Sequence, residues 1–224
     1  MVLVAGSVMA DPKDDVKAAA AALGAADNYS WHQTVEVPAD SQFKPGPTDG
    51  KTEKGGYTTI SFSFGDNTTE AVLQGTNGAI NSPDNGWQSL SEAAQAGGRG
   101  AFLPRMLQNY KMPAAQAADI ADAAKDLTSG TNGISGDLTG DGAEALMSFR
   151  GPRRGATPPA ITNPKGSVAF TIADGKLVKY SYHVTGSMDF GGNNMDIDRT
   201  TTVEIKDVGT TKIEVPDDAK KKLQ

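Results

Sequence analysis

The last quarter of the chain has the most regular alternation of apolar and polar residues. Two alternating runs flank Asp174-Gly175, and a third follows the glycine- and asparagine-rich residues 191–194. Residues two positions apart lie on the same face of a strand, and Asp-Gly between two such runs is a strong hairpin signal. We therefore predict a three-stranded antiparallel meander with one apolar face. Its first two strands contribute Val168, Phe170, Ile172, Val178, Tyr180, Tyr182, Val184, Met188 and Phe190 to that face.

The third strand of this meander continues the same pattern. The residues expected on its apolar face are Met195, Ile197, Val203 and Ile205, and those on its polar face are Asp196, Asp198, Thr200, Thr202, Glu204 and Lys206. By the same alternation, His183 should point away from Tyr180 and Tyr182. The polar face contains no recognisable catalytic constellation. The meander therefore predicts an architecture rather than a reaction.

Helical spacing of apolar residues predicts four helices earlier in the chain. Residues 11–26 form an alanine-rich segment with a narrow apolar stripe, so this helix should pack closely against a sheet. Residues 113–127 begin at a proline and end just before Gly130, as amphipathic helices do. A short helix is expected near residues 89–96. Thr139 is expected to cap another that continues to Phe149.

The other alternating segments predict short strands. They are residues 29–37, residues 59–64 and a segment around residues 71–73. Residues 39–56 and 151–165 are rich in proline, glycine and charged residues, so both are expected to be polar loops. Antiparallel strands with helices inserted midway favour an α+β domain with one large sheet.

This order of elements resembles the LolA/LppX superfamily of exported bacterial envelope proteins. The local resemblance lies in "GSVAFTIADGKLVKYSYHVTGSMDF" and "TTTVEIKDVGTTKIEVP", where an Asp-Gly hairpin leads to a final strand and a Val-Pro stop. The resemblance implies an open half-barrel, made of a large, strongly curved antiparallel sheet with helices packed on its concave face. It also implies a protein that handles a lipid, although no lipid-handling residue of the family matches a position in this chain.

Composition and charge narrow the classes of function. The length of 224 residues suits one domain, and the chain has no apolar run near ~18 residues that would span a membrane. The net charge is −6 with both signs interspersed, which argues against nucleic acid as the main partner. The absence of cysteine excludes disulfides, thiolate metal sites and cysteine nucleophiles. We expect no cofactor.

The first ten residues indicate export. Residues 1–10 are apolar and end in Val8-Met9-Ala10, with small or aliphatic residues at the positions that a signal peptidase inspects. We interpret this segment as the remnant of a signal peptide and expect a periplasmic or secreted protein whose single domain spans residues 11–224. The alternative is an apolar N-terminus without a targeting role.

Three patterns resemble functional sites but each lacks an essential part. Residues 46–52 resemble a phosphate-binding loop, yet they lead into a strand and have one residue too few between the glycines. Ser41 and Lys44 have the Ser-x-x-Lys spacing but lie among prolines instead of starting a buried helix. The start of a calcium loop is suggested by Asp137, Thr139, Asp141 and Gly142. Its twelfth position is Ser148 instead of glutamate, so a helix-capping turn is favoured.

The titratable residues do not predict a catalytic or metal site. His32 and His183 are the only histidines, and both alternate onto polar strand faces, so surface histidines are favoured over a catalytic triad. A chance acidic cluster is favoured over a weak cation site for Asp189, Asp196 and Asp198 at a hairpin tip. We therefore predict that the protein is not an enzyme and assign no catalytic or metal-binding residue. A hydrolase ranks third among the functions that we consider.

The apolar face of the sheet is the remaining candidate site. The residues predicted to bind a ligand are Trp31, Phe62, Phe64, Phe170, Tyr180, Tyr182 and Met188. In one interpretation they form ordinary core beneath the helices. In the other, alanine-rich helices leave an apolar cavity of roughly a few hundred Å³ for an acyl chain or a similar molecule. The leading hypothesis is a non-enzymatic carrier of a lipid or other hydrophobic molecule. The alternative is a structural module with a filled core that binds an envelope protein.

Overall fold

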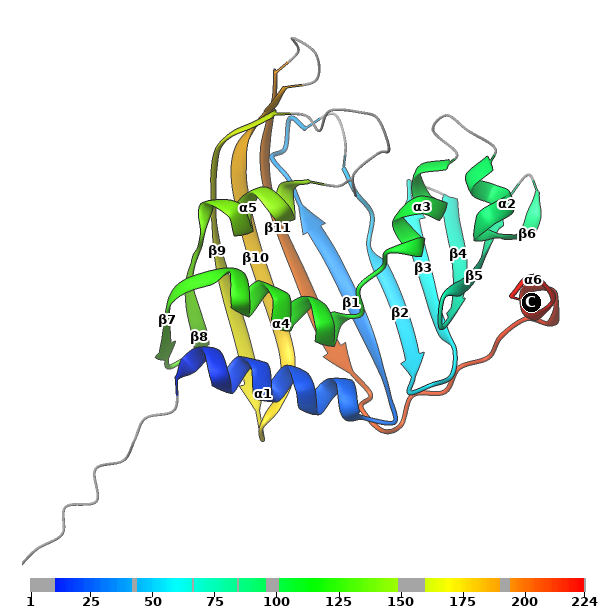
Figure 1. The fold of residues 1–224 in the computed structure, drawn as a ribbon, viewed down its shortest axis with the longest axis horizontal. Helices are drawn as coiled ribbons and strands as arrows, with labels where there is room; N and C mark the ends of the chain where they lie inside the picture. The colour runs from blue at the N-terminus through cyan, green and yellow to red at the C-terminus, as the bar shows by residue number, and fades with distance from the viewer. Residues whose placement is uncertain are drawn as a thin grey trace, which may run out of the picture.

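One large antiparallel sheet organises the protein. The computed structural model describes residues 11–41, 44–65, 67–83, 85–95, 101–148, 160–189 and 194–223. Within them, an 11-stranded sheet has the order β6-β5-β4-β3-β2-β1-β11-β10-β9-β8-β7 (Figure 1). The strands are β1 Asn28–Glu36, β2 Thr48–Glu53, β3 Thr58–Phe64, β4 Asn67–Gln74, β5 Asn77–Ser82, β6 Gly86–Ser89, β7 Ala124–Gly130, β8 Gly133–Leu138, β9 Ala160–Ala173, β10 Lys176–Asp189 and β11 Asn194–Lys206. Consecutive strands pair with each other except β6 and β7, which form the two edges of the sheet, and β1 pairs with β11 to join the two halves.

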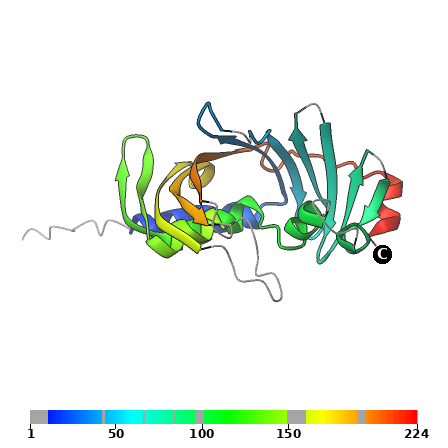
Figure 2. The same cartoon turned by 90° about the horizontal axis from the view of Figure 1, so that it is seen from above.

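The sheet is curved, and all of the described helices except α6 lie on its concave side. The helices are α1 Pro12–Ala25, α2 Leu90–Gln95, α3 Phe102–Gln108, α4 Pro113–Ala123, α5 Gly140–Met147 and α6 Asp217–Lys222. Figure 2 shows the arch of the sheet from above, with α1 and α4 across its inner side. Helices α2 and α3 contribute buried residues to the same core at the other end of the sheet. The predicted fold class, an α+β open half-barrel with helices on the concave face, is confirmed.

Helix α1 forms as its sequence predicts. The side chain of Asp11 accepts a hydrogen bond from the backbone N–H of Lys13 at 2.9 Å and caps the helix, while Asp14 and Asp15 lie in the first turn. Its buried stripe is Val16, Ala19, Ala20 and Leu23. This stripe is narrow and rich in alanine, so α1 lies close to the sheet and to α4.

The helix predicted for residues 113–127 is too long. Helix α4 ends at Ala123, and residues from Ala124 to Gly130 form β7 instead. Strand β7 pairs with β8 through Ala124↔Leu138 and closes its hairpin at Gly130↔Gly133. The spacing of the apolar residues suits a helix, but pairing with β8 satisfies the backbone groups at this edge of the sheet. The turn between the strands uses a φ of 121° at Gly133, which favours glycine.

The polar loop predicted for residues 39–56 contains a strand. Strand β2 occupies the second half of this segment and pairs with β1 and β3. Its inward positions are Thr48 and Gly50, so they give no apolar alternation that a sequence reading could detect. Gly50 lies opposite Trp31, and a Cβ at Gly50 would lie 2.0 Å from Cζ2 of the indole. A glycine is therefore required for the indole to lie over β2.

The β9–β10 hairpin confirms the predicted turn and corrects one residue of the strand. Asp174 and Gly175 both have positive φ, at 52° and 72°. A β-bulge between Leu177 and Lys179 places Leu177 in the core, whereas Val178 is only half-buried. Beyond the bulge the register is as predicted: Tyr180 and Tyr182 point into the core, and His183 does not.

In β11, one residue predicted to face the core is exposed, and two polar residues that were not predicted to face the core are buried. Met195 is 47% exposed, because the start of β11 lies beyond the helices that cover the sheet (Figure 1). Further along, Arg199 and Thr201 share the inward face with Ile197 and Val203 and are buried. Strand alternation places these two positions on the inward face. Because their side chains are polar, the pattern of apolar residues did not identify them as buried.

Candidate functional site

The concave face brings together the residues predicted to bind a ligand. Six of them are buried members of one continuous apolar core: Trp31, Phe62, Phe170, Tyr180, Tyr182 and Met188. Phe64 is the last residue of β3, and its side chain lies outside the described residues, as does Phe190. The six residues come from β1, β3, β9 and β10, so the arched sheet gathers them from both halves of the chain.

An aromatic cluster lies near the centre of this face. The ring of Trp31 stacks on Tyr110 at a centroid distance of 6.4 Å and an interplanar angle of 24°. Tyr29 lies on the other flank, 5.9 Å from the indole. Tyr110 belongs to the connection between α3 and α4, and the sequence reading did not identify it. Because Tyr110 lies in neither neighbouring helix, only the tertiary structure shows that it belongs to the core.

Helix α4 lies directly on the aromatic rings. Ala117 and Ala121 are fully buried against the sheet. The hydroxyl of Tyr180 donates a hydrogen bond to Oε1 of Gln116 at 2.6 Å. The hydroxyl of Tyr29 accepts a bond from the backbone of Ala114. The backbone of α4 packs most closely against α1, and long side chains of the sheet such as Tyr180 reach α4 from below.

Burial changes the acidity of three tyrosines in this core. Desolvation raises the pKa of Tyr29 to about 12, partly offset by the hydrogen bond from the Ala114 backbone. Desolvation also raises the pKa of Tyr110 and, more strongly, that of Tyr180. The three hydroxyls therefore stay protonated at neutral pH and act in the core as hydrogen-bonding groups rather than as charges.

Arg199 places a cationic side chain in the same core. Its Nη2 donates a hydrogen bond to the carbonyl oxygen of Leu146, in the last turn of α5. Burial lowers the pKa of the guanidinium, and nearby Tyr182 opposes that effect. Arg199 thus ties α5 to β11. Arg199 lies two residues after Ile197 and four before Val203, so strand alternation could have placed its side chain on the same inward face.

Two cavities adjoin this core. The first has a volume of about 110 Å³ and is lined by Gly56, Thr58, Leu73, Gly75, Thr76, Asn77, Leu90, Leu107, Gln108, Tyr110 and Met112. The second is an open groove of about 330 Å³ between α1 and the turns of β7–β8 and β9–β10. Neither is lined by the seven predicted ligand-binding residues. Ligand pockets usually measure ~300–1,000 Å³, so the first cavity has room for a small group only.

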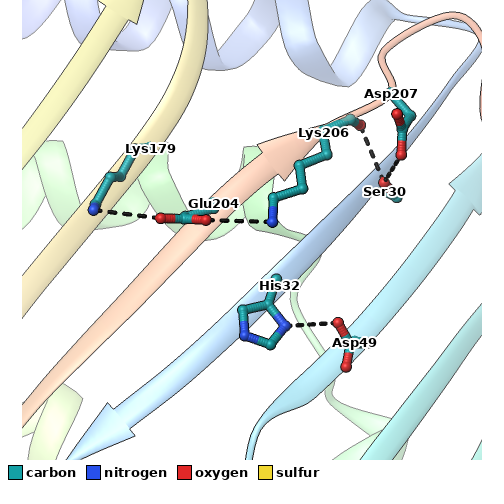
Figure 3. Close-up of polar contacts among 7 residues, drawn as sticks. All are labelled: Ser30, His32, Asp49, Lys179, Glu204, Lys206 and Asp207. Carbon is teal, nitrogen blue, oxygen red and sulfur yellow. Dashed lines mark hydrogen bonds and ion pairs between the residues drawn. The ribbon is translucent and has the colours of Figure 1, made fainter.

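The convex face carries charged pairs and no catalytic arrangement among the described residues. Nδ1 of His32 lies 2.7 Å from the carboxylate of Asp49, and Glu204 lies between Lys179 and Lys206 (Figure 3). The second histidine likewise pairs with an aspartate on the adjacent strand. Neither imidazole contacts a hydroxyl in the described part of the chain. No group of three or more histidine or acidic side chains there is placed to hold a metal ion.

The other site-like patterns have structural roles. Thr139 caps α5, because its hydroxyl accepts a hydrogen bond from the backbone N–H of Gly142 at 3.0 Å, as predicted. Helix α5 ends at Met147, and Phe149 lies outside the described residues. Residues 46–52 lead into β2 and do not start a helix. None of the helices in the described ranges is long and apolar enough to cross a membrane.

Comparison with known proteins gives a likeness in structure only. No family model and no curated protein sequence matches the chain. The structure of lipoprotein LppX from Mycobacterium tuberculosis matches with a TM-score of 0.51 and 12% identity, covering 92% of this chain and 98% of LppX. LprF from Mycobacterium bovis follows at 0.45 and 11% identity, covering 93% and 97%. The LolA superfamily protein NE2245 from Nitrosomonas europaea matches at 0.35 and 8%, covering 92% and 96%.

These identities are too low to transfer a function, but the LppX match extends over nearly the whole of both chains. The order of the strands, the curvature of the sheet and the helices on its inner side agree with that likeness. The protein therefore has a fold like that of LppX.

Proposed function

We propose that this protein is an exported, non-enzymatic carrier that binds a lipid or another hydrophobic molecule in the bacterial cell envelope. The ligand lies between the concave face of the sheet and α4. The residues that contact it are those predicted from the sequence, Trp31, Phe62, Phe64, Phe170, Tyr180, Tyr182 and Met188, together with Tyr110.

The observation that carries this proposal is the difference in side-chain size between the two facing surfaces. The sheet contributes large aromatic and aliphatic side chains, whereas α4 contributes Ala114, Ala117 and Ala121 beside Ile120. Few large side chains of the helix insert between those of the sheet, so lifting α4 breaks little interdigitated packing. A hydrophobic ligand that takes the place of α4 shields the same apolar surface of the sheet from water.

The cavity of about 110 Å³ is the part of this site that exists before the ligand enters. Tyr110 lines the cavity and also stacks on Trp31. Movement of this one ring therefore joins the cavity to the space above the central aromatic cluster. The flexible side chain of Met112 at the same wall adapts readily to ligands of different shape.

Export is supported by the apolar residues 1–10 with their Val-Met-Ala ending and by the resemblance to envelope proteins. The absence of an enzymatic role is proposed because the histidines pair with aspartates on the convex face, away from the buried site. We also propose a single domain of residues 11–224, which the one continuous sheet supports.

Uptake of a fluorescent fatty acid tests the carrier function. We expect the protein to bind the probe and Ala117→Phe to lower the affinity at least roughly tenfold, because the added ring takes ligand space beneath α4. The added ring also costs the fold about 1–3 kcal/mol through overpacking. The matched control is Ala115→Phe on the exposed side of the same helix, which should leave uptake unchanged.

Native mass spectrometry of protein isolated from an envelope extract provides the second measurement. A bound lipid-sized mass supports the carrier and its location. If the wild-type protein takes up no probe and carries no ligand, the carrier function is wrong. The second candidate, an envelope module that binds another protein, is favoured by the complete burial of the six aromatic and methionine side chains, and it would then replace the carrier.

A further inference from the structure

We propose that the C-terminal residues 207–223 form a clasp that fastens the far end of the sheet from its convex side and thereby holds together the walls of the cavity of about 110 Å³. This role goes beyond ligand binding, because it concerns how access to the cavity is controlled. The clasp consists of the strand-free residues 207–216, called the strap here, and α6.

The strap is fixed to the centre of the sheet at its start. The backbone N–H of Gly209 donates to the carbonyl of Asn28 at 2.8 Å, and that of Thr211 donates to Oδ1 of Asn28 at 2.7 Å. The hydroxyl of Thr211 donates to the carbonyl of Asp207 at 2.8 Å. From this anchor, the strap runs along the lower edge of the sheet in Figure 1 and reaches α6 at the β5–β6 end.

Helix α6 covers a small apolar cluster separate from the main core. Its buried members are Val72, Ala79, Ala219 and Leu223, with Tyr57, Trp87 and Val215 packed around them. The neighbours of Val72 in β4, Ala71 and Leu73, belong to the main core on the other face. Because side chains alternate along a strand, α6 lies on the convex side of the sheet that α2 and α3 cover from within.

The clasp contacts two elements that line the cavity. Nδ2 of Asn77 donates to the carbonyl of Leu223 at 2.8 Å, and Asn77 is itself a wall residue of the cavity. Nζ of Lys222 lies 3.2 Å from the carboxylate of Glu92 in α2. The same helix supplies Leu90 to the opposite wall. The clasp therefore fixes the positions of β5 and α2 relative to each other.

Glu92 is well placed to transmit this contact. Its carboxylate accepts a hydrogen bond from the backbone N–H of Ser89 at 2.9 Å, and its own N–H donates to the Ser89 hydroxyl at 3.2 Å. This reciprocal pair is a capping box at the start of α2. Lys222 thus holds the carboxylate that also orders the first turn of the helix carrying Leu90.

The clasp is also built to open before the rest of the fold. Helix α6 has six residues, which is too short to be stable without its contacts. Its ion pairs are largely exposed, and it buries only Ala219 and the adjoining Leu223. Segments with few buried contacts open locally at lower free energy than the core does. Detachment of α6 frees β5 and α2 without unfolding the sheet.

Two ligand-free measurements test the clasp. The first is hydrogen exchange of residues 75–78 and 89–95 in Leu223→Ser and in Lys222→Glu, a surface change that preserves folding. The second is acrylamide quenching of Trp31 in a Trp87→Phe background, because Trp31 stacks on the cavity residue Tyr110. The matched control is Lys221→Ala, which removes only the pair with Asp218 inside α6.

We expect exchange of both segments to accelerate about tenfold in the two clasp variants and Trp31 quenching to increase, while the control matches the parent. If exchange accelerates only within residues 210–223 and quenching of Trp31 is unchanged, α6 merely covers its own apolar cluster and the clasp is wrong. Because neither measurement needs a ligand, failure of the carrier function leaves this result interpretable.

Discussion

At the scale of single residues, the core depends on pairs that combine one very large and one very small side chain. Trp31 and Gly50 lie opposite each other on β1 and β2, and the indole occupies the space where a side chain of residue 50 would be. Tyr110 then stacks on the indole. A glycine in a strand usually weakens it, so its presence here indicates a close approach by another group.

Replacement of Gly50 by alanine should therefore disturb the aromatic cluster. The new Cβ meets the rigid indole at 2.0 Å, so the ring must move. We expect a loss of about 1–3 kcal/mol in the free energy of unfolding and a shift in the emission of Trp31, measured by urea unfolding with Trp87→Phe as background. Gly140→Ala is the control, because a Cβ there meets nothing within 4 Å. Equal stability of the two variants would contradict this account.

At the scale of elements, α4 packs closely against α1 and is attached to the sheet through shared core side chains and a small number of polar contacts. The bond from Tyr180 to Gln116 joins the most deeply buried tyrosine to the helix. Lys17 of α1 pairs with Asp122 of α4 at 2.8 Å, so the two helices are tied to each other as well as to the sheet. They are therefore expected to move together when the ligand site opens.

Removal of the Tyr180 hydroxyl tests this attachment. Tyr180→Phe deletes the donor to Gln116 while keeping the ring, so we expect a loss of about 0.5–1.5 kcal/mol in the free energy of unfolding. If α4 lifts to admit a ligand, the same variant should take up the fluorescent fatty acid faster. Tyr57→Phe, in the outer apolar cluster, is the control. Slower or unchanged uptake together with lower stability would show that this bond does not restrain the helix.

At the scale of the whole molecule, one sheet connects the two halves through the β1–β11 pairing. The ends of the sheet are protected differently. Strand β6 is short, and β7 has an irregular pairing with β8 between Lys125 and Thr128. Short or bulged edge strands do not readily accept another strand.

The buried tyrosines predict how the whole fold responds to alkaline pH. The pKa of Tyr29 is raised from 10.0 to about 12 in the folded state, and those of Tyr110 and Tyr180 are raised too. A raised pKa means that their stabilising contribution is complete below pH 10 and is lost as the pH increases toward 12 and above. For Tyr29 alone this loss is on the order of 3 kcal/mol.

We therefore expect three of the five tyrosines to ionise only together with unfolding, as measured by absorbance at alkaline pH alongside circular dichroism. Coincident transitions in the two signals would also support one cooperative domain. Ionisation of all five tyrosines near pH 10 with the circular dichroism unchanged would contradict the burial described here.

Much of the fold could be predicted because the periodicity of a strand or helix depends on residues that are close together in the sequence. The face of Tyr180 and Tyr182, the turn at Asp174-Gly175 and the cap at Thr139 depend on residues a few positions apart, and all three were predicted correctly. Strand β2 and the end of α4 could not be predicted in this way. Their conformations depend on partners far along the chain, or on glycine and threonine positions that have no apolar period.

The sequence by itself determined the inward face of most core strands and one large antiparallel sheet, because alternation and helical spacing are local properties, and the resemblance implied that the sheet is curved. The tertiary structure alone decided what covers that face. Whether alanines leave a cavity or let a helix approach depends on the distance between α4 and the sheet, and no local pattern contains that distance. The same reason explains Tyr110, Arg199 and the C-terminal clasp, whose roles arise only from contacts between segments remote in sequence.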